Sequence, residues 1–322
     1  MSALGLTDYP ALALWQIALD GTVVAENLLG QDTGVGIIRY EGLGLPGQRT
    51  ADQALPHDHG VVALGDFHAA RSLVFELCIT GAGDVAATRA ADAWTQLRTL
   101  AGVWQARTAD VVLELCMTDG STYALSGRPR KFDADTAGLR LGVVSVAVEF
   151  VATDPRLYAT TVETFSVVLD TATPAAGGLC LTDTPNGGGP AQVLCFTDTP
   201  NAGGPASVLC LSPRTAGLEA VNVRGNTPTY PYTTFFGPVT DPRIINETTN
   251  RTLSFVATVA ASHTLAVDHK TRTVTLDGAP RPDLIGANAD FWPLLPGLNN
   301  VRYLNSTSGA TRSTGAYRVA WL

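Results

Sequence analysis

The densest group of potential metal ligands is the segment 57–59, followed by Asp66 and His68. In an extended strand, His57 and His59 would lie on the same side, so their imidazoles could hold a divalent cation. The same residues also fit a polar turn that leads into the apolar run 61–64. The sequence therefore defines a candidate polar loop, and we expect neither a metal nor another cofactor in it: His57, Asp58, His59 and His68.

Two pairs of carboxylates lie close together in the sequence, Asp133 with Asp135 and Glu149 with Asp154. A glycosidase needs such a pair on opposite sides of a cleft, which sequence alone does not show, and acidic surface turns are an equally good explanation. The chain also lacks the Gly-x-Ser-x-Gly, Gly-x-x-x-x-Gly-Lys-Ser/Thr and His-Glu-x-x-His motifs of common active sites. We therefore expect that the protein is not an enzyme.

Three of the five cysteines, Cys180, Cys195 and Cys210, recur in a repeat with a period of 15 residues. Each copy reads as a short strand, and Thr-Asp-Thr-Pro-Asn follows the strand in the first two copies. The spacing differs from that of zinc-binding Cys-x-x-Cys pairs, so equivalent small apolar positions explain the thiols better than a metal does. Asp183 and Asp198 are too few for a calcium loop and fit turns. Residues 172–216 are predicted to be a structured insert or linker.

The overall charge argues against nucleic acid as a stable partner. The formal net charge is −8, and an acidic surface repels phosphate. The first 20 residues lack the pattern of a signal peptide, and no apolar stretch approaches the ~20 residues of a membrane-spanning helix. We therefore expect no membrane association, assembly in the cytoplasm and reduced thiols.

A mainly β domain with one helix is predicted for residues 1–171. Alternating or apolar runs predict strands at 15–19, 61–64, 72–79, 111–117, 123–126 and 143–151. Residues 84–104 interrupt this rhythm with a helical spacing, with Asp84 as a candidate N-cap and an apolar face listed here: Ala90, Trp94, Leu97 and Ala101. The Gly- and Pro-rich stretch 30–60 is predicted to be a mostly irregular loop that forms a contact surface.

A compact β-sandwich is predicted for residues 217–322. Strands are expected at 253–259, 263–267, 273–276, 301–305 and 317–321, and a hairpin is expected around His269-Lys270-Thr271. Aromatic residues of this part could stack on sugar rings, although core packing explains most of them. They are Tyr230, Tyr232, Phe235, Phe236, Phe291, Trp292 and Trp321.

Several motifs follow one another in order along the second half of the chain. Gly-Pro-Val-Thr-Asp-Pro-Arg-Ile at 237–244 is followed by Asn246, by Leu-Ala-Val-Asp at 265–268, and by Thr-Val-Thr-Leu-Asp-Gly at 273–278. The series closes with Asp-Phe-Trp-Pro-Leu-Leu-Pro-Gly-Leu-Asn at 290–299. This order resembles that of the distal tail (Dit-like) proteins of siphophages. In the first half, Asp-Pro-Arg-Leu-Tyr at 154–158 resembles the strand that ends the family's first domain. The 15-residue repeat departs from the family pattern.

The resemblance implies an N-terminal β-sandwich or split-barrel-like domain that forms a ring, usually a hexamer, and a galectin-like C-terminal β-sandwich. It implies a structural protein of the virion tail tip in a long-tailed, non-contractile phage. The implied partners are further copies of the chain, the tail tube protein, the tape-measure protein and the tail-associated lysin or central hub protein. The alternative is a carbohydrate-binding module that attaches the tail tip to a glycan of the host cell wall.

Overall fold

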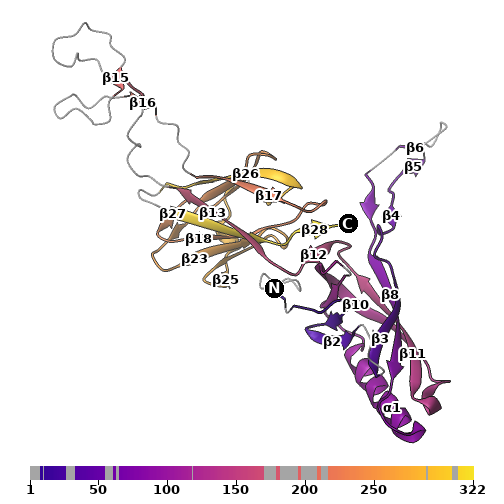
Figure 1. Ribbon diagram of the computed structural model, residues 1–322. Coiled ribbons are helices and arrows are strands. Elements are labelled where there is room, and N and C mark those ends of the chain that lie inside the picture. The colour runs from indigo at the N-terminus through magenta and orange to yellow at the C-terminus, as the bar shows by residue number, and fades with distance from the viewer. Residues whose placement is uncertain are drawn as a thin grey trace, which may run out of the picture. The chain divides into compact units, whose positions relative to one another are not determined.

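The computed structural model describes residues 8–9, 11–26, 33–54, 61–62, 65–117, 119–169, 179–181, 195–196, 209–211, 217–287, 289–306 and 311–322. The chain divides into two compact units. Unit 1 comprises 1–163 together with two later segments, 223–229 and 316–322. Unit 2 comprises 164–222 and 230–315. As predicted, the fold is mainly β, and the described residues contain one α-helix, α1 (Figure 1).

Unit 1 is built on a nine-stranded antiparallel sheet whose main path runs β2-β1-β9-β10-β11-β8-β3. The strands along that path are Thr22–Ala25, Ile17–Leu19, Val111–Cys116, Thr122–Asp135, Val143–Ala152, Arg71–Thr80 and Gly34–Glu41. Two short strands complete the sheet, β12 (Leu157–Ala159) and β28 (Ala320–Trp321). Because β28 pairs with β12, the end of the chain forms part of this sheet.

The two ends of this sheet approach each other, so the sheet nearly closes on itself. An isolated parallel bridge joins Glu26, next to β2, to Gly36 in β3, and the Glu26 N–H donates to the Val35 carbonyl over 2.9 Å. In β8 and β11 every second residue is buried, as expected for strands with one face on a core. This closure fits the split-barrel-like arrangement that the resemblance implies.

Helix α1 (Ala86–Val103) packs against β8, β11 and the 3-10 turn η1 (Leu139–Leu141). The helix is where the sequence predicts it, but two details of the prediction are wrong. The N-cap is Val85 rather than Asp84, and Trp94 is 46% exposed. The buried face consists of Ala93, Leu97, Leu100 and Trp104, so it shares Leu97 with the predicted face but is displaced from it by three positions. Its spacing is the same as that of the predicted face, which is why periodicity alone did not distinguish them.

A two-stranded arm leads away from the sheet between β3 and β8 (Figure 1). We define the arm as residues 43–70, of which 43–54, 61–62 and 65–70 are described. It contains the antiparallel pairs β4 (Gln48–Arg49) with β7 (Phe67–His68), and β5 (Gln53–Ala54) with β6 (Val61–Val62). The prediction of a mostly irregular loop over 30–60 is therefore wrong, since it overlooked β3 and these paired segments.

Unit 2 contains a six-stranded and a four-stranded antiparallel sheet. The first has the order β13-β27-β18-β23-β24-β25, formed by Glu163–Leu169, Thr311–Tyr317, Tyr232–Phe236, Thr264–Asp268, Thr273–Leu276 and Ala279–Pro280. The second has the order β17-β26-β20-β21, formed by Leu218–Val223, Gly297–Leu304, Arg243–Asn246 and Arg251–Ser254. Phe235 of β18 lies 5.8 Å from Tyr303 of β26, ring centre to ring centre, and both side chains are fully buried. The two sheets thus share one core, as in a β-sandwich.

Local sequence accounts for most of unit 2. The predicted hairpin is formed by β23 and β24, and Arg272 in its turn has a positive φ of 57°. The predicted strand at 253–259 is interrupted, because β21 ends at Ser254 and β22 (Thr258–Val259) pairs with β19 (Val239–Thr240) instead. The 3-10 turn η2 (Pro282–Leu284) follows β25. In the described part of the chain, no helix has the length and apolar character needed to span a bilayer.

The three copies of the repeat each contribute one short strand, as their composition predicts. These are β14 (Leu179–Leu181), β15 (Cys195–Phe196) and β16 (Leu209–Leu211). They pair as a separate antiparallel sheet with β14 in the centre. The predicted turns of the repeat, including Asp183 and Asp198, lie outside the described residues.

Candidate assembly surface

The two-stranded arm of unit 1 carries exposed apolar side chains. Leu45 is 76% exposed and Phe67 is 58% exposed, although both are of the types that proteins normally bury. The neighbouring Gln48, Arg49 and His68 are also exposed. Large exposed apolar side chains on a projecting hairpin are typical of surfaces that contact another protein.

One buried arginine holds the root of the arm. Arg71, the first residue of β8, is only 1% exposed. Its Nη1 donates to the carbonyls of Gly42 (3.0 Å) and Gly44 (2.6 Å), and its Nε donates to the carbonyl of Pro155 (2.8 Å). Gly42 has a φ of +94°, and a Cβ there would lie 1.9 Å from the Ser72 carbonyl oxygen. The chain therefore enters the arm through a backbone conformation that glycine permits and Arg71 fixes.

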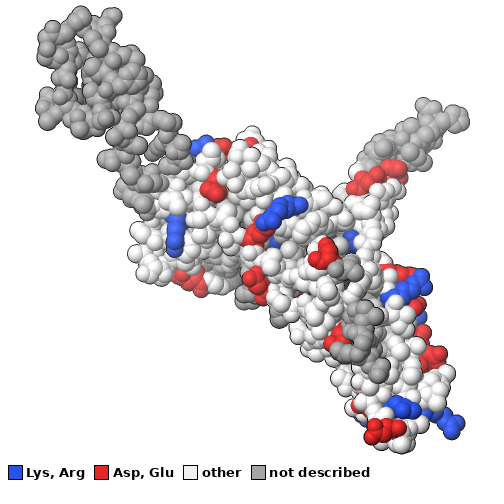
Figure 2. Space-filling view, in the orientation of Figure 1, with Lys and Arg blue, Asp and Glu red and all other residues white. Residues whose placement is uncertain are grey.

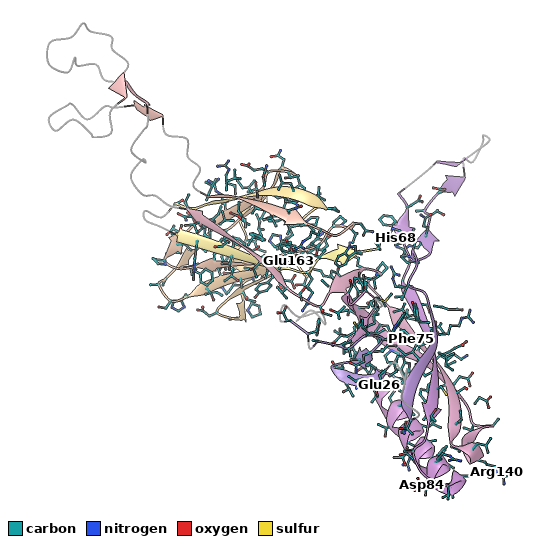
Figure 3. All side chains as sticks on the ribbon, in the orientation of Figure 1. Glu26, His68, Phe75, Asp84, Arg140 and Glu163 are labelled. Carbon is teal, nitrogen blue, oxygen red and sulfur yellow. The ribbon has the colours of Figure 1, made fainter. Side chains whose placement is uncertain are left out.

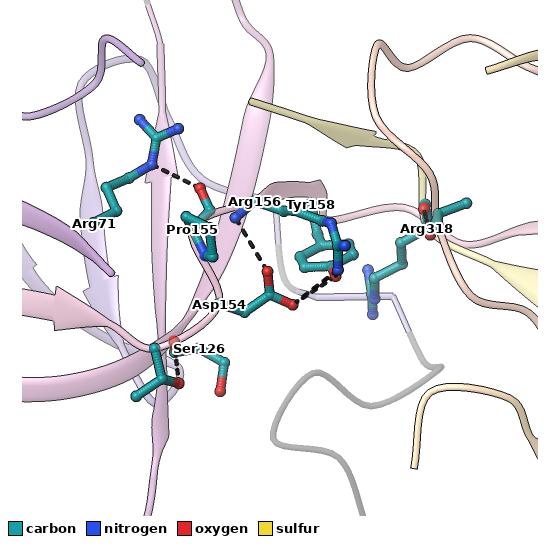
Figure 4. Close-up of polar contacts among 9 residues, drawn as sticks. Arg71, Ser126, Asp154, Pro155, Arg156, Tyr158 and Arg318 are labelled. Carbon is teal, nitrogen blue, oxygen red and sulfur yellow. Dashed lines mark hydrogen bonds and ion pairs between the residues drawn. The ribbon is translucent and has the colours of Figure 1, made fainter. Parts of the chain in front are cut away.

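The Asp-Pro-Arg-Leu-Tyr motif contains Pro155, whose carbonyl accepts the hydrogen bond from Arg71 Nε (Figure 4). The Asp154 carboxylate accepts hydrogen bonds from the Arg156 N–H at 3.2 Å and from the Tyr158 hydroxyl at 2.8 Å. Arg156 also forms an ion pair with Asp154 over 3.5 Å. These bonds form an Asx-type turn between β11 and β12, and Pro155 lies at its apex.

A second buried arginine, Arg318, fixes the final segment of the chain within unit 1. Arg318 is 3% exposed, and its Nη1 donates to the carbonyls of Ala159, over 2.9 Å, and Thr160. Its guanidinium lies 4.4 Å from the centre of the Tyr9 ring. Burial lowers the pKa of Arg318 and raises the pKa of Glu114, whose charge is partly compensated by Arg318. Segment 316–322 is thus held by charge-assisted hydrogen bonds as well as by the β12–β28 pairing.

Strands β10, β11, β8 and β3 present a polar face on the side away from the hydrophobic core. The register places Arg39, Glu76, Ala147 and Asp133 in one row across the four strands. We call the residues in phase with this row the outer face. Its charged members are Arg39, Glu41, Glu76, Arg128, Lys131, Asp133, Asp135 and Glu149. Five carboxylates against three cations give this face a small negative net charge. In the view of Figure 2 both signs are interspersed among uncharged residues.

The Phe-Trp-Pro-Leu-Leu-Pro-Gly-Leu-Asn motif of unit 2 buries Trp292, Leu294 and Asn299, while 296–298 are exposed. Trp292 and Asn299 are both 0% exposed. The Asn299 side chain accepts from the Leu295 N–H at 2.9 Å, and donates to the carbonyls of Leu295 at 2.7 Å and Gly297 at 3.1 Å. A side chain with three such bonds folds its own loop into a fixed turn. The motif therefore builds the core of unit 2.

Buried His269 supports the same motif. Its Nδ1 accepts a hydrogen bond from the Trp292 N–H over 3.2 Å, and its Nε2 lies 3.2 Å from the Thr233 hydroxyl. The imidazole and the Trp292 ring are 4.5 Å apart, centre to centre. Burial lowers the pKa of His269 from 6.5 to about 3, so the ring is neutral at physiological pH.

The candidate polar loop is described only in part. His57, Asp58 and His59 lie outside the described residues. His68 is an exposed residue of β7 in the arm and lies apart from Glu26 and Asp84 in Figure 3. Among the residues whose side chains are described, no cluster of three or more His, Cys, Asp or Glu could hold a metal ion. The expectation of no cofactor stays a prediction.

The carboxylates of the two candidate pairs form ion pairs and hydrogen bonds with neighbouring side chains. Asp133 forms an ion pair with Lys131 over 3.3 Å, and Glu149 accepts from the Ser72 hydroxyl over 2.6 Å. Asp154 forms the turn described above. These contacts lie along strands and in a turn, whereas glycosidase chemistry requires two carboxylates that face one bond.

The aromatic residues proposed as a sugar platform are mostly engaged by the protein itself. Phe235 and Trp292 are fully buried, and the Arg312 guanidinium lies 4.6 Å above the ring of Phe236. Trp321 packs edge-on against Tyr123 in unit 1, with ring centres 5.3 Å apart. Tyr230, Tyr232 and Phe291 are partly exposed. Core packing and strand pairing thus account for most of the aromatic residues.

Residues 224–321 match a protein family described as the siphovirus-type tail component, C-terminal domain. The sequence matches none of the curated proteins with which it was compared. Among solved structures it is similar to the SPP1 Dit protein, with 14% identity, a TM-score of 0.62 and coverage of 96% of this chain and all of that chain. That protein is described as a paradigm of the hub adsorption apparatus in phages that infect Gram-positive bacteria.

A second similar structure is a chain of the phage P2 baseplate in its activated conformation with calcium. It is 10% identical, with a TM-score of 0.46, and the match covers 94% of this chain and 98% of that chain. The SPP1 match identifies the fold, and the family match identifies the C-terminal segment. Residues 224–321 therefore match the siphovirus-type tail component domain, and the fold of the chain is similar to that of the SPP1 Dit protein.

Proposed function

We propose that the protein is a distal tail protein that forms a ring, a hexamer by the family resemblance, between the tail tube and the tail-tip hub of a long-tailed, non-contractile phage. The observation that carries this proposal is the combination of a siphovirus tail component domain with a Dit-like fold over almost the whole chain. Its place is the virion tail tip, after assembly in the host cytoplasm. Its role is structural, without catalysis.

The arm supplies a means of self-association. Closed rings need heterologous interfaces, in which one surface of a subunit meets a different surface of the next. An arm that exposes Leu45 and Phe67 and is held at its root by Arg71 is such a one-sided feature. We assign ring formation to residues 1–171, and an outer, galectin-like position to residues 217–322, with 172–216 as the insert between them.

The outer face has the chemistry required of a channel wall. DNA crosses a phage tail without sticking, and a surface with a small excess of carboxylates repels phosphate. We infer that the outer face lines the channel, around the tape-measure protein. The triple variant Glu76→Gln, Asp133→Asn, Asp135→Asn should raise DNA retention on assembled rings at low salt, and added salt should remove the difference. Equal retention by both proteins would contradict this assignment.

Ring formation is tested by mass measurement and negative-stain imaging of the purified full chain. The expected result is a closed ring with a central hole. The variant Phe67→Ser should reduce the ring fraction, whereas Val256→Ser, which changes a residue of unit 2 that is 70% exposed, should leave it unchanged. Rings that survive Phe67→Ser and Leu45→Ser together would show that the arm does not join the copies. A monomer under all conditions, with the tube and hub proteins added, would contradict the proposal.

The carbohydrate-binding alternative remains testable on the same protein. Full-length chain is preferable to residues 217–322, because 223–229 and 316–322 belong to unit 1. Saturable binding on a glycan array would favour a role in host attachment. We expect none, since most of the candidate platform is buried or covered.

A further inference from the structure

The end of unit 1 opposite the arm also carries exposed apolar side chains. Strand β8 leads from Arg71 at the arm root to Thr80, and its 10 residues span roughly 30 Å. Figure 3 shows Asp84 and Arg140 at this far end and His68 in the arm. We call the following five residues of the far end the tip: Asp84, Val85, Arg140, Leu141 and Val143.

Close backbone packing brings the tip residues together. The Gly81 N–H donates to the Gly142 carbonyl over 2.8 Å, which joins the turn before α1 to the turn before β11. A Cβ on Gly142 would lie 2.5 Å from the Arg89 Cβ, so the residues on either side of Gly142 lie against the first turn of α1. Val85 caps that same turn. The three apolar residues of the tip are therefore neighbours at one end of the sheet.

The tip is far more exposed than its apolar residue types usually are. Leu141 is 69% exposed, Val85 is 56% exposed and Val143 is 39% exposed. Asp84 and Arg140 are exposed as well, and neither forms an ion pair with a residue that the structure describes. Single exposed apolar residues are normal on a protein surface, whereas a group of them rimmed by charges is typical of an interface.

The arm has the same combination of side chains. Leu45 and Phe67 are its exposed apolar residues. Arg49 lies directly opposite Phe67 in the β4–β7 pair, and Asp66 precedes Phe67 in the chain. Both charged residues are exposed, and the described part of the chain offers neither of them an ion-pair partner. Each end of unit 1 therefore combines exposed apolar side chains with one cation and one anion.

A closed ring requires the arm to meet a different surface of the next copy. We propose that the arm of each copy docks on the tip of the next copy. Apolar side chains of both surfaces are buried in this contact, Asp66 pairs with Arg140, and Arg49 pairs with Asp84. The inference rests on the proposed ring, and it names the surface that accepts the arm.

Two singly defective full-length chains test this contact. Phe67→Asp has a defective arm and an intact tip, whereas Leu141→Arg has a defective tip and an intact arm. Under conditions in which the unmutated chain forms rings, each variant alone should stay monomeric by mass photometry. An equimolar mixture should give dimers that grow no further, because the free ends of each dimer are a defective arm and a defective tip. Far-UV circular dichroism checks that both variants are folded.

The charges provide a second measurement. Arg140→Asp sets two carboxylates against each other and should lower the ring fraction, and Asp66→Arg in the same chain should restore it. Arg98→Asp, which changes an exposed arginine of α1 outside the tip, is the matched control and should leave the ring fraction unchanged. A double variant that assembles no better than Arg140→Asp would overturn the proposal.

Two results of the mixing experiment would also overturn it. Closed rings from Leu141→Arg alone would leave the ring in place and assign the tip to a different tail protein. Monomers in the equimolar mixture would show that the arm and the tip do not bind each other. A failure of the proposed function is distinguishable from both, because the unmutated chain itself would then form no rings.

Discussion

The arm root of unit 1 and the Phe291–Asn299 region of unit 2 are both fixed by hydrogen bonds from polar side chains to the backbone. In unit 1 these bonds hold an exposed element, and in unit 2 they hold a buried core. In unit 1, Arg71 and the Asp154 turn use backbone carbonyls to hold an exposed hairpin in place. In unit 2, Asn299 and His269 use backbone groups to close a core around Trp292. The family match covers the second region and not the first. A recognisable motif can thus mark the part of a protein that maintains the fold, while the surface that contacts partners lies elsewhere.

The largest expected effect is on the core of unit 2. Trp292→Ala should lower the free energy of unfolding by about 4 kcal/mol, because it removes a fully buried indole and leaves a cavity. Urea unfolding followed by far-UV circular dichroism measures this. Leu298→Ala, which changes a residue of β26 that is 59% exposed, is the control and should cost little. A loss below about 1 kcal/mol for Trp292→Ala would mean that the motif is not a core element.

The next effect concerns the arm root. Arg71→Ala should cost about 3 kcal/mol, since three backbone carbonyls lose a charged donor that is itself buried. It should also increase hydrogen exchange at the root of the arm. Arg49→Ala in the arm removes an exposed arginine and should change stability by less than about 0.5 kcal/mol. If the two variants were equally stable, Arg71 would not be the anchor.

Acid should weaken the unit 2 core through His269. The folded pKa of about 3 lies below the ordinary value of 6.5, so the unfolded chain binds a proton first as the pH falls. Stability is therefore complete above pH 6.5 and decreases between pH 6.5 and 3, with a contribution of about 2 kcal/mol lost at pH 5 relative to pH 7. The free energy of unfolding is measured at pH 7 and pH 5 for the original protein and for His269→Gln. The loss between the two pH values should be smaller in His269→Gln by about 2 kcal/mol. The same pH dependence in both proteins would rule out His269 as the cause.

The smallest effect tests the orientation of α1. Trp94→Ala should change the free energy of unfolding by less than about 0.5 kcal/mol, whereas Leu97→Ala should cost about 3 kcal/mol. The reason is exposure, 46% for Trp94 and 5% for Leu97. Thermal unfolding of the two variants side by side distinguishes them. If Trp94→Ala lowered the free energy of unfolding more than Leu97→Ala, the buried face of α1 would be the one predicted from the sequence.

Much of the β architecture could be predicted from local patterns, because long half-buried strands such as β8 and β11 alternate strictly. The phase of α1 could not, since two faces with the same spacing both contain small and apolar residues. The arm was missed because β4 to β7 have two residues each, too few to show a period.

The roles of the two buried arginines could not be predicted either. Arg71 and Arg318 look like ordinary surface charges in the sequence, and only long-range pairing buries them. Trp321 pairs with Leu157 across the length of the chain, which no local pattern reports. For Arg71 the available signal was its position at the start of a strand beside a glycine-rich stretch. For the repeat, the period predicted the strands and not which strand is central.

The most direct test of the proposed role is a density map of an intact virion tail that contains this chain. The account predicts an annulus of several copies at the far end of the tail tube, with the arm of each copy against its neighbour and the outer face of the sheet toward the channel. Density for this chain anywhere else in the particle, or as isolated single copies, would contradict it.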